Sequence, residues 1–401
     1  MKALFLVDNI MAMRMFAPII TALPRDWECL FINFDGWTEQ SRAKIDDYAS
    51  ELGIRCRLHK KQNKQGVCEI IDEENPSVIV FAREEATPTE CLFAEMSLEK
   101  GIPTLLVPHG ALMSDMAMMN LGSADSKLFR IRHLCWLAGQ AYKKLRREKI
   151  SIFRLIQIGL FRIRNDFQNS EAQSRYDRYT KIATFGETMK DMLLTRHVKP
   201  ESIVITGSTK FDAYVGMKDY KLNAGRKRIL IFTDYLADIG VWSIKQRAEY
   251  ILAIYRLNQL DLNIELAIKI HPTVEEKKDY AKIIRCYTHS PSIYKEETLP
   301  ELINECDIAI TLTSSAGLEA MSARKPLVIY NPFGDITIYD ELSGAYIANS
   351  EDELRKVVGE LFGEGIDTEH MKMADKFVYN HTYIQDGKAS ERIAKLIEEM
   401  V

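Results

Sequence analysis

Short apolar runs recur along the whole chain, separated by longer stretches that have the mixed polarity of helices. In the first half these runs lie at 3–7, 29–34, 78–81, 104–107, 181–185 and 203–206. A second series lies at 229–232, 264–270, 308–312 and 327–330. Strand-sized apolar runs that alternate with helical segments indicate βαβ units and parallel sheets. The pattern therefore predicts an α/β protein with two Rossmann-like domains.

The two series of predicted strands are separated by a polar stretch, so we place the domain boundary near 207–225. The chain has 401 residues, of which 46% are hydrophobic, which is enough for two separate cores. We expect a first domain over 1–210 and a second over 211–385.

A turn of small hydroxyl residues, Thr-Leu-Thr-Ser-Ser-Ala-Gly over 311–317, follows a predicted strand and precedes a short predicted helix. In a parallel sheet this places a helix N-terminus at the carboxyl edge, where N–H groups and the helix dipole attract phosphate. Small residues such as Gly317 let an anion approach the backbone, and Thr313, Ser314 and Ser315 add hydroxyl donors. The alternative is that Ser314 and Ser315 only cap the helix.

A second strand end carries a histidine. The apolar run 264–270 is followed by His271 and Pro272, and proline stops a strand. We therefore expect His271 at the carboxyl end of its strand, where open α/β sheets bind ligands. Strand ends of neighbouring βα units share an edge, so His271 and the 311–317 turn are predicted to face one phosphorylated ligand.

These two motifs resemble the His-Pro and Ser-Ser motifs of GT-B glycosyltransferases, particularly the CDP-glycerol glycerophosphotransferases and the capsule-polymer transferases. The matching residues are Lys269, His271, Pro272, Thr313, Ser314, Ser315 and Glu319. The resemblance implies a GT-B fold, in which two Rossmann-like domains face each other across a cleft and the second binds the donor nucleotide. It also implies that Lys269 lies in the donor site and that Glu319 accepts hydrogen bonds from the ribose hydroxyls.

Two further segments carry the resemblance. The run 203–212 is similar to the Gly-Asn-x-Lys-(Phe/Tyr)-Asp segment of Kdo transferases, with Gly207 and Lys210 in place and Ser208 where asparagine is usual. The C-terminal segment 386–401 is similar to the closing helix of these transferases and of the non-hydrolysing UDP-N-acetylglucosamine 2-epimerases. This similarity implies that the last helix packs back on the first domain and that Lys210 helps to hold the donor phosphate.

The first domain has its own strand-end histidine, His109, which follows Val107 and Pro108 and precedes a glycine. An imidazole titrates near neutral pH, so His109 is a candidate base for an acceptor hydroxyl. The site also resembles the His-Gly site of the glycerophosphotransferases, where a histidine is implicated as base. Asp115 and Asp8 are the alternative bases.

The segment 127–164 is basic and rich in aromatic and aliphatic residues, whereas the whole chain has a net charge of -4. Such segments lie on anionic membrane surfaces. The alternative is a pair of amphipathic helices whose Lys and Arg form a solvated face. The overall acidity argues against a nucleic-acid partner.

The sequence lacks the motifs of several kinds of cofactor, nucleotide and metal site. No Gly-x-Gly-x-x-Gly follows the first predicted strand and no Walker motif is present, so neither a redox dinucleotide nor a P-loop nucleotide site is expected. No Asp-x-Asp or histidine spacing indicates a metal, so we expect neither metal nor cofactor. The seven scattered cysteines and the short first apolar run indicate a cytoplasmic protein. If the basic segment binds lipid, we expect the protein to lie peripherally on the inner face of the cell membrane.

The hypothesis from sequence is an inverting, metal-independent transferase. It moves a sugar or polyol phosphate from a CMP-, CDP- or UDP-activated donor to a glycan or lipid-linked acceptor of a cell-surface polymer. His109 would take the acceptor proton, while His271, Lys210 and the 311–317 turn hold the donor phosphate. The alternatives are a UDP-N-acetylhexosamine 2-epimerase, although its Gly-Thr-Arg-Pro-Glu and His-x-Glu-Ala-Gly segments are absent, and a non-catalytic scaffold of a polymer-synthesis complex.

Overall fold

The computed structural model describes most of the chain outside its middle. The described residues are 1–34, 39–59, 63–83, 87–108, 176–217, 227–238, 240–260, 263–272, 274–285 and 291–401. They divide into two compact units. The first unit contains the described residues up to Pro108, from Tyr176 to Asp212 and from His381 to Val401; the second contains those from Ala213 to Asn380.

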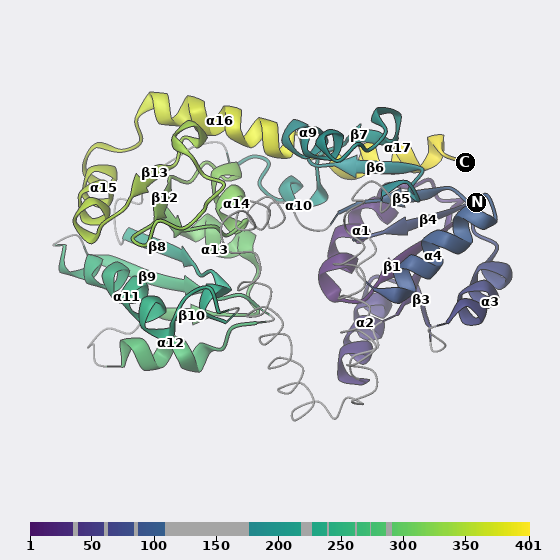
Figure 1. The fold of residues 1–401 in the computed structure, drawn as a ribbon, viewed down its shortest axis with the longest axis horizontal. Helices are drawn as coiled ribbons and strands as arrows, with labels where there is room; N and C mark the ends of the chain where they lie inside the picture. The colour runs from purple at the N-terminus through teal and green to yellow at the C-terminus, as the bar shows by residue number, and fades with distance from the viewer. Residues whose placement is uncertain are drawn as a thin grey trace. The chain divides into compact units, whose positions relative to one another are not determined.

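The first unit contains a seven-stranded parallel sheet in the order β3-β2-β1-β4-β5-β6-β7 (Figure 1). Its strands are β1 (Lys2–Val7), β2 (Glu28–Asn33), β3 (Arg55–Leu58), β4 (Val78–Phe81), β5 (Thr104–Leu106), β6 (Lys181–Thr184) and β7 (Ile203–Ile205). The flanking helices are α1 (Ile10–Ala22), α2 (Glu39–Glu51), α3 (Lys64–Glu74), α4 (Pro88–Glu99), α9 (Glu187–Thr195), α10 (Thr209–Asp212) and α17 (Ala389–Glu399). The strand order reverses between β1 and β4, and such a point is where doubly wound sheets bind ligands.

The second unit repeats this topology with a six-stranded parallel sheet in the order β10-β9-β8-β11-β12-β13. Its strands are β8 (Lys227–Phe232), β9 (Ile264–Lys269), β10 (Ser292–Tyr294), β11 (Ile308–Thr311), β12 (Leu327–Tyr330) and β13 (Tyr346–Ala348). Its α-helices are α11 (Ile244–Tyr255), α12 (Lys277–Ile284), α13 (Leu299–Glu305), α14 (Ala316–Ser322), α15 (Glu351–Glu364) and α16 (Thr368–Thr382). Here the order reverses between β8 and β11. The predicted α/β fold class with two Rossmann-like domains is confirmed.

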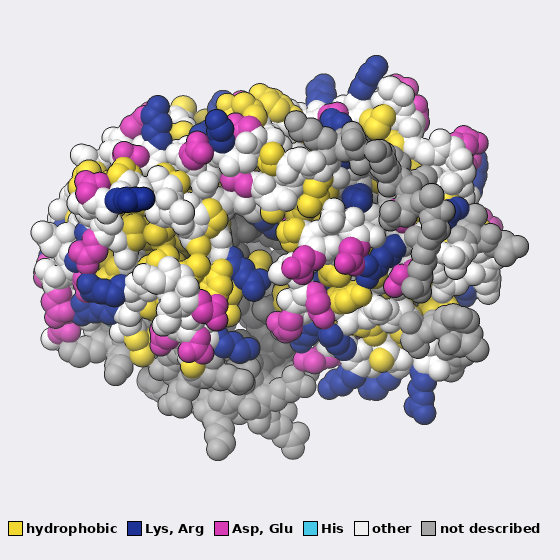
Figure 2. Space-filling model, turned by 180° about the vertical axis from the view of Figure 1, so that it is seen from behind, with side chains coloured by type: hydrophobic (Ala, Val, Ile, Leu, Met, Phe, Trp, Pro, Cys, Tyr) yellow, Lys and Arg dark blue, Asp and Glu magenta, His cyan; other side chains and the backbone are white. Residues whose placement is uncertain are grey.

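Charged side chains of both signs are interspersed over the face shown in Figure 2. No helix in the described part of the chain is both long and apolar enough to cross a membrane. The basic segment 127–164 lies outside the described residues, so its predicted membrane contact stays a prediction.

The last helix, α17, belongs to the core of the first unit. Its side chains Ile393 and Ile397 are fully buried in one cluster with Phe5 and Phe16, which come from β1 and α1. The carboxylate of Asp212 in α10 accepts the N–H groups of the first two α17 residues at 3.4 Å each. Both hydrophobic burial and capping therefore hold the C-terminal helix to this unit.

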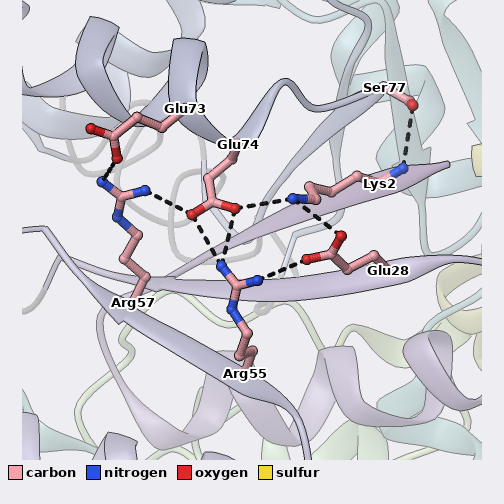
Figure 3. Close-up of polar contacts among 7 residues, drawn as sticks. All are labelled: Lys2, Glu28, Arg55, Arg57, Glu73, Glu74 and Ser77. Carbon is pink, nitrogen blue, oxygen red and sulfur yellow. Dashed lines mark hydrogen bonds and ion pairs between the residues drawn. The ribbon is translucent and has the colours of Figure 1, made fainter.

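An ion cluster ties β1, β2 and β3 to the end of α3 (Figure 3). Glu74 is 7% exposed, and its carboxylate accepts from Arg57 at 2.7 Å and from Lys2 and Arg55 at 3.1 Å. Glu28 bridges Lys2 and Arg55. Because the buried carboxylate has three cationic partners, its charge is compensated inside the fold.

Candidate functional site

The carboxyl ends of β8 and β11 meet at the topological switch point of the second unit, and Asp234 links them. Thr313 Oγ1 donates to Asp234 Oδ1 at 2.6 Å. The backbone N–H groups of Leu312 and Thr313 both donate to Asp234 Oδ2 at 3.2 Å. Burial raises the pKa of Asp234 to about 6, although these hydrogen bonds favour its ionised form.

The Asp234 carboxylate therefore accepts donors that the sequence analysis assigned to a phosphate. In this structure the N–H and hydroxyl groups of Thr313 point to a side chain of the same unit, an arrangement that the sequence did not predict. Ser314 Oγ accepts the N–H of Ala316 at 3.3 Å, which fits the capping alternative for this residue. Ser315 makes no side-chain capping bond and is exposed. Ser315 is thus the most exposed hydroxyl residue of this turn.

Gly317 and Glu319 lie in α14, directly after the turn. A Cβ on Gly317 would lie 2.6 Å from the phenolic oxygen of Tyr339, which itself donates to Ser314 O at 2.7 Å. Glu319 is 2% exposed and accepts a hydrogen bond from Tyr214 at 2.6 Å. In this structure Gly317 makes room for a tyrosine, and the Glu319 carboxylate is buried against another. Neither arrangement was expected from the sequence.

His271 follows β9, as predicted, and lies on the same sheet edge as Asp234 and the turn. Its ring packs edge-on against Tyr235, with 4.8 Å between the ring centroids. Burial, with Lys269 and Lys295 nearby, lowers the pKa of His271 to about 4. The imidazole is therefore neutral at neutral pH, able to donate one hydrogen bond to a phosphate without carrying a positive charge.

A buried carboxylate, Glu275, fixes the loop that carries His271. Glu275 is fully buried, and its Oε2 accepts the backbone N–H of His271 at 2.6 Å and the hydroxyl of Thr233. Its Oε1 accepts from Tyr280 of α12. Three donors on separate elements thus converge on one carboxylate, which sets the direction in which the strand end leaves the sheet.

Lys269, which the resemblance places in the donor site, donates hydrogen bonds to backbone carbonyls in this structure. It is 8% exposed, and its ammonium group donates to Lys295 O at 2.6 Å and to Ile270 O at 3.4 Å. These bonds tie the end of β9 to the residue after β10. Burial lowers the pKa of Lys269, and its ammonium group points to backbone carbonyls.

In the first unit, Gly207 and Lys210 lie around α10. Gly207 has φ +76° and packs under Arg392, whose Nη2 would be 3.3 Å from an added Cβ. Arg392 Nε donates to Thr206 O at 2.6 Å. Contacts with the C-terminal segment therefore explain why a glycine lies at position 207. Lys210 is partly exposed.

The switch point of the first sheet carries an ion pair that the sequence analysis did not assign. Arg83 follows β4 and pairs with Asp8, which follows β1. Arg83 Nε also lies 3.7 Å from Glu90, a buried residue whose pKa burial raises to about 7. His109 and Asp115 lie outside the described residues; the last described residue before His109 is Pro108, after β5.

Sequence reasoning thus missed Asp234, Glu275 and Arg83. A search for polar residues at strand ends, which identified His271, would also have identified two of them, because Asp234 and Arg83 each lie within two residues of a strand's carboxyl end. Glu275 had no such signal, because it lies in a loop and acts through contacts with β8 and α12. In the described part of the chain, no group of three or more His, Cys, Asp or Glu side chains could hold a metal ion.

Comparisons with known proteins bear on the fold and on the segment that carries these residues. The sequence model of a family described as capsule polysaccharide biosynthesis protein matches residues 230–335, a segment that contains Asp234, His271 and the 311–317 turn. No curated protein sequence matches the chain.

Solved structures match over the full length of the chain. Among them is the MnaA–UDP complex of S. aureus, with 17% identity, 100% of this chain and 97% of that chain covered, and a TM-score of 0.60. A UDP-GlcNAc 2-epimerase of Neisseria meningitidis bound to UDP-GlcNAc has 16% identity, full coverage of both chains and a TM-score of 0.61. Anabaena Alr3699/HepE in complex with UDP-glucose has 12% identity, full coverage of both chains and a TM-score of 0.54. At these identities the similarity shows the fold, which is the GT-B-like two-domain α/β fold expected from sequence.

Proposed function

We propose that this protein is a metal-independent transferase of polysaccharide biosynthesis that uses a nucleotide-activated sugar or polyol as donor. The observation that carries the proposal is that Asp234, His271 and the Ser314–Ser315 turn lie on one carboxyl edge of the second unit's sheet, around its switch point. The match of residues 230–335 to the capsule polysaccharide family supports it, because that segment holds all of these residues. Structural neighbours solved with UDP, UDP-GlcNAc or UDP-glucose support a nucleotide-linked donor.

In the proposed reaction, the acceptor hydroxyl oxygen forms a bond to the anomeric carbon of the sugar, or to the phosphorus of a polyol phosphate. The bond from that atom to the leaving nucleotide phosphate breaks, and the hydroxyl proton passes to a base. His109 is the proposed base, with Asp115 and Asp8 as alternatives. Neutral His271 donates a hydrogen bond to the phosphate oxygen on which charge develops, and Ser315 adds a hydroxyl donor.

Lys210 is the proposed cationic partner of the donor phosphate, as the resemblance implies, because Lys269 donates to backbone carbonyls. Asp234 and Glu275 act as positioning residues, the first for the turn and the second for the His271 loop. The role of Glu319 toward a ribose requires its carboxylate to exchange the Tyr214 hydrogen bond for one from the ligand.

A 2-epimerase is the second candidate, because full-length structural neighbours are described as UDP-GlcNAc 2-epimerases. The missing Gly-Thr-Arg-Pro-Glu and His-x-Glu-Ala-Gly segments favour the transferase. A non-catalytic scaffold would keep nucleotide binding alone. We further propose that the basic segment 127–164 brings the protein to an anionic membrane surface and a lipid-linked acceptor.

Incubation of the purified protein with a panel of CMP-, CDP- and UDP-linked sugars and polyols tests these candidates. Acceptor-dependent release of the nucleotide supports transfer. Interconversion of UDP-N-acetylhexosamines without release supports the epimerase, and binding without any turnover supports the scaffold. Sedimentation with anionic vesicles at low salt tests the membrane proposal, which fails if the protein stays in the supernatant.

A further inference from the structure

A cavity lies at the sheet edge of the second unit that is opposite to Asp234 and His271. It is lined by residues at the amino ends of β12 and β13 and at the start of α16, is open to solvent on one side, and has a volume of about 570 Å³. Small-molecule sites typically enclose about 300–1,000 Å³. Because parallel strands place their amino ends on one edge, this cavity is separate from the proposed donor site.

A close backbone contact builds one wall of the cavity. Gly344, with φ +75°, lies directly against α16: a Cβ there would be 2.3 Å from Ala374 N and 2.5 Å from His370 O. Beside this contact, the rings of Tyr346 and His370 stack at 4.1 Å with an angle of 7° between their planes. The cavity therefore has a fixed aromatic wall.

The other lining residues combine apolar and cationic groups. Met321, Leu327 and Met371 contribute apolar surface. The charged lining residues are Arg324, Lys325, Lys372 and Asp375, which leaves an excess of positive charge. An aromatic and apolar wall with surplus cations is complementary to an anion that has a flat, apolar body.

Among the cationic residues that line the cavity, Arg324 has an unusual backbone conformation. It follows α14 with φ +56°, in the left-handed region that glycine or asparagine usually occupies at a helix C-terminus. A non-glycine residue in this conformation costs free energy, so a guanidinium here indicates a demand for the side chain. Arg324 Nη2 contacts both carboxylate oxygens of Asp375, at 3.2 and 2.9 Å, so this carboxylate lies beside the guanidinium at the cavity and competes with a bound anion for it.

We propose that this cavity is a binding site for a small planar organic anion, held by Arg324 and Lys372 at its charged group and by Tyr346, His370 and Met371 along its body. The site is independent of the donor nucleotide. It would give the second unit a ligand contact at the C-terminal end of α14, the helix that begins beside Ser315.

Calorimetric titration of the intact protein with 2-naphthalenesulfonate tests the proposal, with neutral 2-naphthol as the uncharged analogue. The sulfonate should bind and the naphthol should bind at least about tenfold more weakly, since a charged hydrogen bond is lost. Excess UDP should not displace the sulfonate. No binding of the sulfonate at millimolar concentration, or its displacement by UDP, would overturn the proposal.

Substitutions locate the site. Arg324→Gly should weaken sulfonate binding about tenfold or more without lowering the melting temperature, because glycine suits the left-handed backbone. Asp375→Asn should strengthen binding, because it removes the competing carboxylate. Lys376→Gln is the matched control, since Lys376 is an exposed residue of α16 that does not line the cavity. Equal binding by wild type, Arg324→Gly and Asp375→Asn would show that the sulfonate binds elsewhere and would refute the assignment.

Discussion

The absence of a side chain at Gly317 determines how the Ser314–Gly317 turn packs. An added Cβ would lie 2.6 Å from Tyr339 Oη and 2.9 Å from its ring carbon Cζ. Tyr339 is 1% exposed and holds Ser314 O, so it has little room to move. We expect Gly317→Ala to lower the free energy of unfolding of the second unit by about 1–3 kcal/mol through overpacking, measured by urea unfolding.

Gly359 in α15 provides the matched control. Among the described residues, no atom beyond its chain neighbours and its own helix backbone lies within 4 Å of an added Cβ at Gly359, and its backbone is helical. Gly359→Ala should therefore stabilise the protein by about 0.5–1 kcal/mol. Equal stability of Gly317→Ala and wild type, with the control behaving as stated, would show that Tyr339 yields and that the turn is not constrained in this way.

His271 gives the residue-scale test of the proposed donor site. Replacement by alanine should lower kcat/KM by about 10²–10³, the usual effect of removing one preorganised hydrogen-bond donor. Because burial lowers the pKa of His271 to about 4, the residue stays neutral between pH 6 and pH 8, and the loss should be the same at both. A loss that grows as the pH falls toward 6 would mean that the charged imidazole acts, and wild-type turnover would remove His271 from the mechanism.

At this scale the sequence predicted where His271 and the 311–317 turn lie, because a proline and small hydroxyl residues mark strand ends. It did not predict which donors are already satisfied. Thr313 and Lys269 have the right chemistry for phosphate, yet Asp234 and two backbone carbonyls accept their hydrogen bonds. Such pairings depend on distances between strands, which a sequence pattern does not contain.

At the scale of elements, the buried carboxylate of Glu74 tests how α3 is attached to the sheet. Burial opposes its ionisation, but hydrogen bonds from Arg57 and Lys2 outweigh this, and the pKa of Glu74 is lowered. Glu74→Gln should lower the free energy of unfolding at pH 7 by about 2–4 kcal/mol, because three cations lose their shared partner. Thermal unfolding measures the effect.

The contribution of Glu74 to the stability of the fold should change with pH in one direction. A carboxylate with a lowered folded-state pKa contributes stability above its ordinary pKa of about 4.3 and loses that contribution as the pH falls through the folded value. The difference between wild type and Glu74→Gln should therefore shrink in acid. Glu73→Gln is the control: Glu73 is 60% exposed and, among the residues drawn in Figure 3, pairs only with Arg57, so its loss should be small. Equal effects of both substitutions would contradict the role assigned to burial.

The sequence predicted the apolar interior strands well, because β1, β4, β8 and β11 are buried on both faces. It missed β3, β10 and β13. These strands form sheet edges, and β3 alternates arginine with other residues. Edge strands are stabilised by pairing with a neighbour more than by their own hydrophobicity, so their sequences carry a weak signal.

At the scale of the whole molecule, each unit has its own sheet and its own buried side chains, and the chain returns to the first unit at its end. Local sequence patterns identify α17 as an amphipathic helix but do not state which core receives it. The resemblance to known families predicted that α17 packs on the first domain. In the structure, Ile393 and Ile397 of α17 lie among the core residues of β1 and α1. The stability of the first unit should therefore depend on the last residues of the chain.

Ile397→Ala tests this dependence. Ile397 is fully buried, so its truncation should cost the first unit about 2–5 kcal/mol, through lost burial and the cavity left behind. Differential scanning calorimetry, with limited proteolysis to assign each transition, should show the first unit unfolding at lower temperature while the second unit keeps its transition. Lys395→Ala is the control, since Lys395 is exposed and makes only an i,i+4 pair with Glu399 among the ion pairs found in this helix. If Ile397→Ala instead lowers both transitions by the same amount, the two units unfold together, and α17 does not stabilise the first unit independently.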